Sequence, residues 1–205
     1  YKRQLLFNSI FNNTTNKFKS GLNYTLDKYD ENIDNQNYIR TDKNIGMFFE
    51  WSHDDLEKLS WTAGIRLDFN NNIGTFFTPR LHLRYSFNPS TTIRLSSGSG
   101  RKAANIFAEN QSLFATNRRI IINKNNNSFY GLLPERAWNY GVSLNHNFRL
   151  FSKNSTLTLD YYNTSFVNQV VVDYEKEGTV LFYNLEGNSY SKSLQLKFCL
   201  LYTSD

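Results

Sequence analysis

Four arginines at even-numbered positions are the side chains best suited to bind an anion. A guanidinium stays charged and presents five N–H donors, so it pairs with carboxylates, phosphates and other anions. Local ion pairs with carboxylates such as Asp68, Glu50 and Asp160 are at least as good an explanation. The sequence therefore predicts either an anion-binding surface or a row of internal ion pairs. The four residues are Arg66, Arg80, Arg84 and Arg94.

A second group of candidate binding residues lies in the long segment between residues 102 and 133. Aromatic rings beside cations on a loop suit ligand capture, because loops carry binding residues on a rigid scaffold. The same side chains also suit packing within the loop or contact with lipid phosphates, and these alternatives stay open. The residues are Phe107, Phe114, Arg118, Arg119, Phe129 and Tyr130.

The sequence offers little for enzymatic chemistry. His53 adjoins two aspartates in a turn-like segment, His82 lies between two arginines, and His146 falls among apolar positions near a strand end. No metal-ligand cluster or glycine-rich phosphate loop is present, and the single cysteine, Cys199, cannot form an internal disulfide. We therefore predict no catalytic residues, no bound metal and no cofactor.

The elements that position these residues are predicted to be strands, because apolar and polar residues alternate with a period of two. Between residues 59 and 69 every odd position is apolar and every even position is polar or small. Successive side chains of a strand point to opposite faces, so this pattern indicates an amphipathic strand. Its recurrence predicts an all-β antiparallel meander of about nine long amphipathic strands. They are 3–12, 17–28, 43–53, 58–70, 77–87, 91–101, 135–150, 156–173 and 180–198.

The predicted strands resemble those that cross a membrane as a barrel. Most run about 10–13 residues, whereas soluble strands average ~5–6 and a tilted membrane strand needs ~9–11. Aromatic residues recur near strand ends on the apolar parity, as in the girdles of membrane barrels. Short and longer connections alternate, as periplasmic turns and external loops do. The short ones are 13–16, 54–57, 88–90 and 151–155, the long ones are 29–42 and 102–134, and 71–76 and 174–179 are intermediate.

The composition agrees with two unlike faces. Aromatic residues make up 16% of the chain, yet the mean hydropathy is −0.55. No stretch approaches the ~20 apolar residues of a membrane-spanning helix. The sequence from Tyr1 is strand-like and contains no recognisable signal peptide. The net charge of +5 fits anionic partners, but a solvated polar surface explains it better.

Two motifs in the predicted strands are distinctive. In the first, a Pro-Arg pair at Pro79 and Arg80 is followed by an Arg-Tyr pair ending at Tyr85, and the next predicted strand ends in a Gly-Ser-Gly-Arg sequence. In the second motif, Pro134 and Glu135 open a strand that contains Asn139. Together these motifs resemble signatures of TonB-dependent outer-membrane receptors, especially those of Bacteroidetes-like bacteria, although the Gly-Ser-Gly-Arg sequence lacks the phenylalanine usual in the family. The resemblance covers residues from about 45 to 198.

This resemblance implies a transmembrane barrel of about 22 strands closed by an N-terminal plug. The chain would be an incomplete section of that barrel, in the outer membrane. The implied function is active import of a scarce nutrient, with a ferric siderophore as the default substrate. A passive porin or a glycan-importing receptor is the alternative. A plug nearby would explain why the first predicted strand is apolar on both parities.

The resemblance also implies partners. TonB–ExbB–ExbD would act through the plug, the barrel would contact outer-membrane lipid and lipopolysaccharide, and the loops would bind a small molecule such as a ferric chelate. No nucleic acid is expected. The four lumen-facing arginines would contact plug carboxylates or an anionic substrate, and the aromatic and cationic loop residues would contact ligand.

The last seven residues are interpreted separately. Residues 1–198 are predicted to form the partial barrel domain. Residues 199–205 resemble a translated sequencing adapter and place Cys199 on the polar parity, where it fits poorly. We therefore predict that 199–205 is a non-native tail.

Overall fold

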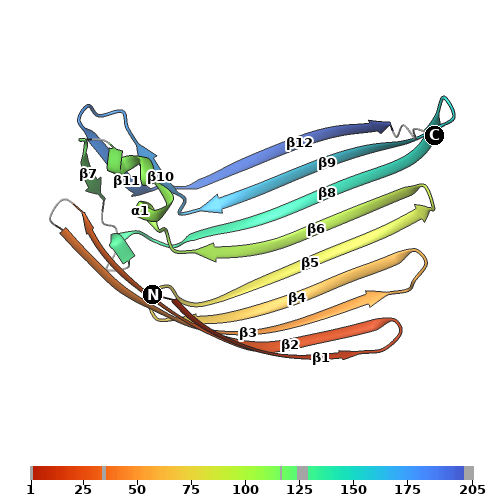
Figure 1. The fold of residues 1–205 in the computed structure, drawn as a ribbon, viewed down its shortest axis with the longest axis horizontal. Helices are drawn as coiled ribbons and strands as arrows, with labels where there is room; N and C mark the ends of the chain where they lie inside the picture. The colour runs from red at the N-terminus through yellow and green to blue at the C-terminus, as the bar shows by residue number, and fades with distance from the viewer. Residues whose placement is uncertain (1, 34–35, 116, 124–128, 201–205) are drawn as a thin grey trace.

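The computed structural model describes residues 2–33, 36–115, 117–123 and 129–200 of the chain. Nine long strands form one antiparallel sheet whose order follows the chain, and Figure 1 shows them side by side as a curved wall. This confirms the predicted meander. The strands are β1 (Lys2–Asn12), β2 (Asn16–Ile33), β3 (Gln36–Asp54), β4 (Leu59–Asn70), β5 (Gly74–Asn88), β6 (Thr91–Lys102), β8 (Glu135–Leu150), β9 (Lys153–Val167) and β12 (Asn188–Leu200).

The remaining elements gather beyond one end of the sheet and form what we call the loop cap, residues 103–134 and 168–187 (Figure 1). A three-stranded sheet pairs β10 with β11 and β11 with β7. The cap elements are α1 (Ile106–Glu109), η1 (Gln111–Ala115), β7 (Arg119–Ile122), η2 (Phe129–Gly131), β10 (Val170–Asp173) and β11 (Thr179–Asn184).

Two predicted boundaries are wrong at the cap end of the sheet. Residues 156–173 and 180–198 do not form single strands, because the chain leaves the sheet after Val167 and returns at Asn188. Asn168 has a φ of 57° and Gly187 has a φ of 95°, and such left-handed residues break a strand. The predicted connection 174–179 is therefore the turn of a hairpin inside the cap.

The predicted long connection 29–42 is also wrong, because β2 and β3 continue through it as one hairpin. Their pairing extends to Ile33 opposite Gln36. Tyr29 lies opposite Arg40, and the Arg40 guanidinium lies 3.9 Å from the centre of the Tyr29 ring. This cation–π contact stabilises the extension.

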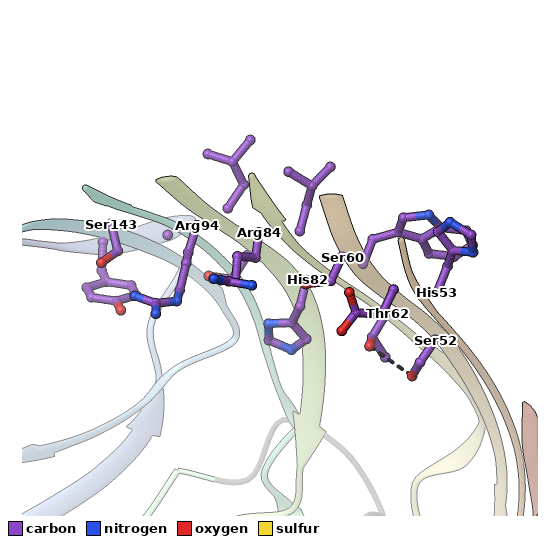
Figure 2. Close-up of a pocket in the computed structure, with 15 residues that line it drawn as sticks. Ser52, His53, Ser60, Thr62, His82, Arg84, Arg94 and Ser143 are labelled. Carbon is purple, nitrogen blue, oxygen red and sulfur yellow. Dashed lines mark hydrogen bonds between the residues drawn. The ribbon is translucent and has the colours of Figure 1, made fainter. Parts of the chain in front are cut away.

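The two faces of the sheet differ as the alternation predicts. On one face the strands expose large apolar side chains, including Phe49, Ile65, Leu81 and Val142. Near the turns at the opposite end from the cap, the Trp51 and Trp61 rings meet edge to face, with centroids 4.4 Å apart. The other face is concave and mainly polar (Figure 2).

The buried apolar residues in the described part of the chain all lie in the loop cap. This location is expected when the apolar face of the sheet is left open to lipid rather than packed on a second layer. None of the described helices is long and apolar enough to cross a membrane. The buried apolar residues are Ala104, Ile106, Phe107, Leu113, Tyr130, Leu132, Val180 and Phe182.

Candidate functional site

Two of the four candidate arginines on the concave face form ion pairs. Arg66 donates from Nε and Nη2 to the Asp68 carboxylate at 2.7 and 2.6 Å, and from Nη2 to Asn23 Oδ1 at 2.6 Å. Arg80 pairs with Glu50, whose other oxygen lies 3.1 Å from Lys19 Nζ. Local ion pairing therefore accounts for Arg66 and Arg80.

Glycines on the concave face make room for these long side chains. A Cβ at Gly64 would lie 2.7 Å from Arg80 Nε, and one at Gly46 would overlap the Arg66 guanidinium and Asn23. Gly64 and Arg80 are direct cross-strand partners. Glycine at positions 46 and 64 therefore leaves the space that the side chains of Arg66 and Arg80 occupy on the surface of the sheet.

Arg84 and Arg94 differ from the other two because they face each other. They are direct cross-strand partners in β5 and β6, an arrangement that costs about 0.2–1 kcal/mol when the charges are alike. Within the described residues neither has a carboxylate partner. Asp160, which the sequence offered as a partner, lies on β9 opposite Ser143. The pair therefore has no ion-pair partner among the described residues. The nearest carboxylates in the register, Asp54 and Asp160, each lie two strands away on the same face.

Arg84 and Arg94 border a groove of about 710 Å³ on the concave face, towards the end of the sheet with the short turns. Figure 2 shows Arg84, Arg94 and His82 projecting into it. Thr62 Oγ1 donates to Ser52 Oγ at 2.9 Å along the same groove. Two guanidinium groups with hydroxyls around them can bind an anion by charge-assisted hydrogen bonds. One carboxylate, that of Asp54, also lines the groove, and its Oδ1 accepts the Leu56 N–H at 2.9 Å. Further polar lining comes from Ser60, Ser96, Ser143 and Tyr162.

Two of the predicted loop residues are packed inside the cap. Phe107 is 2% exposed and Tyr130 is 7% exposed, and their ring centroids lie 5.3 Å apart. Tyr38, from the β2–β3 hairpin, contacts both rings. The Tyr130 hydroxyl donates to the Glu31 carboxylate, and burial together with this contact raises the pKa of Tyr130. These positions match the loop-packing alternative.

Arg118 and Arg119, two other predicted loop residues, lie nearer the surface. Arg118 donates from Nη1 to the carbonyl oxygen of Tyr174 at 3.2 Å, and its guanidinium lies 5.7 Å from the Tyr174 ring centre. Arg119 begins β7 with an exposed side chain. The side chains of Phe114 and Phe129 lie outside the described part of the structure. Arg118 and Arg119 therefore keep their cationic groups where a ligand can reach them.

The Pro-Glu motif connects β8 to the loop cap. Pro134 immediately precedes β8, and the Glu135 carboxylate accepts the backbone N–H of Val170 at 2.8 Å. Asn139 Nδ2 donates to Thr164 Oγ1 at 2.7 Å across the β8–β9 pair. The motif thus fixes where the hairpin of β10 and β11 begins.

The Pro-Arg…Arg-Tyr motif acts within the sheet. Pro79 lies opposite Ile65 on the apolar face, and the pairing of β5 with β6 reaches Arg80 opposite Gly98 but no further. Because proline has no N–H to donate, a ladder commonly stops beside it. Tyr85 lies near the turn, with its ring centroid 5.1 Å from that of Phe87. The motif therefore marks the point beyond which β5 and β6 no longer pair on the side of the loop cap.

Asn184 is a structural residue to which the sequence reasoning assigned no role. It is 4% exposed, its Nδ2 donates to the carbonyls of Leu133 and Asn168 at 3.0 and 2.8 Å, and its Oδ1 accepts the Leu133 N–H at 2.7 Å. The residues next to Asn184 in the sequence do not predict this role, because its hydrogen-bond partners lie 51 and 16 positions away.

The histidines lie apart from one another. His53 Nδ1 lies 3.0 Å from Asn16 Oδ1 beside Trp61, and His146 Nδ1 lies 2.9 Å from Thr91 Oγ1 beside Phe148. His82 lies in the concave groove. Among the described residues no three histidine, cysteine or acidic side chains meet as a metal site.

The tail prediction is not tested by this geometry. β12 continues to Leu200, with Cys199 opposite Thr156, while residues 201–205 lie outside the described part. The non-native origin of residues 199–205 therefore stays a prediction.

Comparison with known proteins identifies the fold. The structure resembles the siderophore receptor PirA from Pseudomonas aeruginosa (TM-score 0.66, 15% identity, 96% of this chain and 36% of that one). It also resembles the copper transporter OprC (0.70, 14%, 98% and 35%) and the FrpB iron transporter from Neisseria meningitidis (0.64, 15%, 100% and 33%). The chain thus spans about a third of the length of these structures. No curated protein sequence matches it.

The family model for the TonB dependent receptor-like β-barrel matches residues 2–198, nearly the whole chain. This match agrees with the meander, the open apolar face and the polar concave face. The chain therefore belongs to the TonB-dependent receptor family and forms part of that family's β-barrel.

Proposed function

We propose that this chain is part of the barrel wall of an outer-membrane active transporter that imports an anionic nutrient complex, by default a ferric siderophore. TonB-dependent receptors are transporters, which excludes the competing enzyme hypothesis. The observation that carries the proposal is the facing pair of Arg84 and Arg94 in the concave groove, which has no ion-pair partner among the described residues. Such a pair favours an anion, either a carboxylate of the plug or the passing substrate.

The concave face also favours a plugged lumen over the open lumen of a porin. Leu6 and Ile10 of β1 lie opposite Asn23 and Lys19, on the concave parity, and are 59% and 55% exposed. Phe48 lies on the same face, above Gly21. Apolar side chains are costly against a water-filled channel and are stabilised by a packed domain. The plug in turn would receive force from TonB–ExbB–ExbD.

We further propose that Arg118, Arg119 and the Phe114 side chain contribute to ligand capture in the loop cap, while Phe107 and Tyr130 position them. Arg118 and Arg119 flank the start of β7, whose strand packs on the cap core. An anionic chelate arriving from outside would meet these cations first. The default substrate rests on the names of similar proteins, which include siderophore and iron transporters.

The test is uptake of radiolabelled ferric siderophores by cells that carry the full-length receptor, with and without TonB. We expect TonB-dependent uptake, and we expect Arg84→Gln with Arg94→Gln to lower it by about tenfold, equivalent to ~1.4 kcal/mol. Arg149→Gln, an exposed cation near a turn, is the matched control. Uptake that does not depend on TonB would instead show a passive channel.

A further inference from the structure

A second pair of facing arginines lies on the opposite, apolar face of the sheet. Arg101 of β6 is a direct cross-strand partner of Arg136 of β8. Arg101 lies on the same face of β6 as Ile93 and Leu95, and Arg136 lies on the same face of β8 as Trp138. The side chains of both arginines therefore leave the backbone on the apolar face of the sheet. Within the described residues neither arginine has a carboxylate partner.

The surroundings of this pair do not neutralise it. Arg101 Nε is buried and has no hydrogen-bond acceptor among the residues that the structure describes, and the guanidinium lies 5.6 Å from the Phe76 ring centre. The nearest acidic side chain in the register is Glu135, and its carboxylate already accepts the Val170 N–H. A buried unpaired donor beside a like charge is unfavourable unless an anion is bound.

A hollow of about 640 Å³ lies directly beside the pair. It opens where β5 and β6 stop pairing beyond Arg80 and Gly98, next to Pro79. Its lining combines the two guanidinium groups with an apolar floor that includes Phe77, Trp138 and Val167. Trp138 Nε1 donates to Ser97 Oγ at 3.1 Å, which fixes the indole to the neighbouring strand β6.

The level of the pair matches a lipid headgroup. The apolar parity of β8 runs from Trp138 to Phe148, which spans about 24 Å along the membrane normal for a strand tilted ~45°. An outer-membrane barrel carries an apolar band of about 25 Å flanked by aromatic girdles. Arg136 therefore lies just beyond the band, at the end with the loop cap.

We propose that Arg101 and Arg136 bind the phosphate group of a phosphorylated, acylated glycolipid of the outer leaflet, with one acyl chain lying on the apolar floor. This inference rests on the proposed membrane orientation. The commitment to a lipid rather than free phosphate comes from that floor, because the charged groups and the apolar side chains line one hollow. Two guanidinium groups suit a phosphate, which accepts several charge-assisted hydrogen bonds.

The test measures lipid binding by native mass spectrometry of the full-length receptor, with lipid A and enzymatically dephosphorylated lipid A as probes. We expect the phosphorylated lipid to bind about tenfold more tightly, and R101Q/R136Q to abolish this preference. R101K/R136K retains the charge and should retain part of it. Lys192→Gln removes an exposed cation on the same parity of β12, opposite Asn163, and should leave it unchanged.

Each outcome decides the proposal. Equal binding of the two lipids, or a preference that survives R101Q/R136Q, would overturn it. If inorganic phosphate displaced lipid A as effectively as a second lipid A molecule does, the apolar floor would make no contribution to binding, and the commitment to a lipid would be overturned. Thermal unfolding checks that every variant is folded. TonB-dependent uptake, measured separately, should be normal in R101Q/R136Q, so a failure of the lipid site and a failure of the transport function give different results.

Discussion

Asn184 concentrates more backbone contacts than any other side chain described in the loop cap. It satisfies backbone groups from residues 51 and 16 positions away, and it is almost completely buried. Leaving buried donors and acceptors without partners costs about 1–3 kcal/mol for each group. A side chain of the same size but without polar atoms would therefore loosen the cap while leaving the strands below it intact.

We expect Asn184→Leu to destabilise the cap by about 1–3 kcal/mol. Hydrogen exchange in the full-length receptor should become faster at Val170 and Leu185, which the hairpin protects, and stay unchanged in β4 and β5. Asn123→Leu, at an exposed position directly after β7, is the control. Unchanged exchange in Asn184→Leu would mean that the cap core alone holds the hairpin.

Asp55 gives the short turn between β3 and β4 a pH dependence. Its Oδ1 accepts the N–H groups of Leu59, Glu57 and Lys58 at 2.9, 2.9 and 2.8 Å, and these bonds lower its pKa. Because the pKa in the folded state is depressed, the stabilisation is complete above the unfolded value of about 3.9 and is lost as pH falls through the folded value.

The corresponding measurement is a carboxyl chemical-shift titration of Asp55 in the receptor in micelles. We expect a midpoint below the usual value and a parallel change at the amides of Lys58 and Leu59. Asp55→Asn should remove the pH dependence of those amides while leaving the turn formed at neutral pH. A midpoint at or above the ordinary value would refute the role of the backbone bonds.

At the scale of single residues, the sequence predicted which side chains are charged and on which face they lie, but it did not predict all of their contacts. It identified Arg66 and Arg80 as charged groups on the polar face, together with their partners Asp68 and Glu50. It did not distinguish Arg84 and Arg94 from them, because whether an ion pair forms depends on cross-strand register. Register follows from the pairing of whole strands, and no short stretch of sequence contains it.

At the scale of the strand, glycines on the concave face leave space that neighbouring side chains fill. Gly46 accommodates the Arg66–Asp68 pair, while a Cβ at Gly100 of β6 would meet nothing within 4 Å. Valine at Gly46 would clash with neighbouring side chains, whereas valine at Gly100 would change only the conformational freedom of the backbone. Comparing the two variants therefore separates the effect of the clash on stability from the effect of backbone freedom. We expect Gly46→Val to lower stability by about 1–3 kcal/mol through overpacking.

Gly100→Val is the matched control and should be neutral or slightly stabilising, because valine favours strands. Both variants are compared by the thermal unfolding midpoint of the full-length receptor. Equal midpoints for the two variants would show that Arg66 moves aside with little loss of stability. Gly46 would then not be needed to make room for Arg66.

The alternation predicted all nine strands of the sheet, and its errors have a common cause. Polar residues occupy most positions of both parities between residues 29 and 42, because the β2–β3 hairpin continues beyond the apolar band, so no regular period of two is visible there. In contrast, Val170 to Val172 looks like a continuation of β9 because it packs on the cap core. The alternation of apolar and polar residues reflects what each face of a strand contacts. It therefore predicts strand boundaries poorly where those contacts change along the strand.

At the scale of the whole molecule, the sheet has two open edges. Within the described residues β1 pairs only with β2, and β12 only with β9. Apolar residues on these edges are more exposed than central ones: Phe7 is 69% and Leu194 is 72% exposed, against 41% for Leu95 and 38% for Leu144. Unpaired edges are not tolerated in lipid, because each backbone group without a partner costs several kcal/mol.

We therefore expect a polypeptide consisting only of residues 1–205 to fail to insert as a monomer. Expressed alone and folded into lipid vesicles, it should give no heat-modifiable, protease-resistant monomer band on gels, and it should associate through β1 and β12 into mixed oligomers. The full-length receptor, treated in the same way, supplies the positive control. Supplying the remaining strands as a second polypeptide should restore a protected species, because the edges are then paired. A discrete protected monomer formed by the fragment alone would mean that its two edges close on each other, and the barrel would then be far smaller than the structures it resembles.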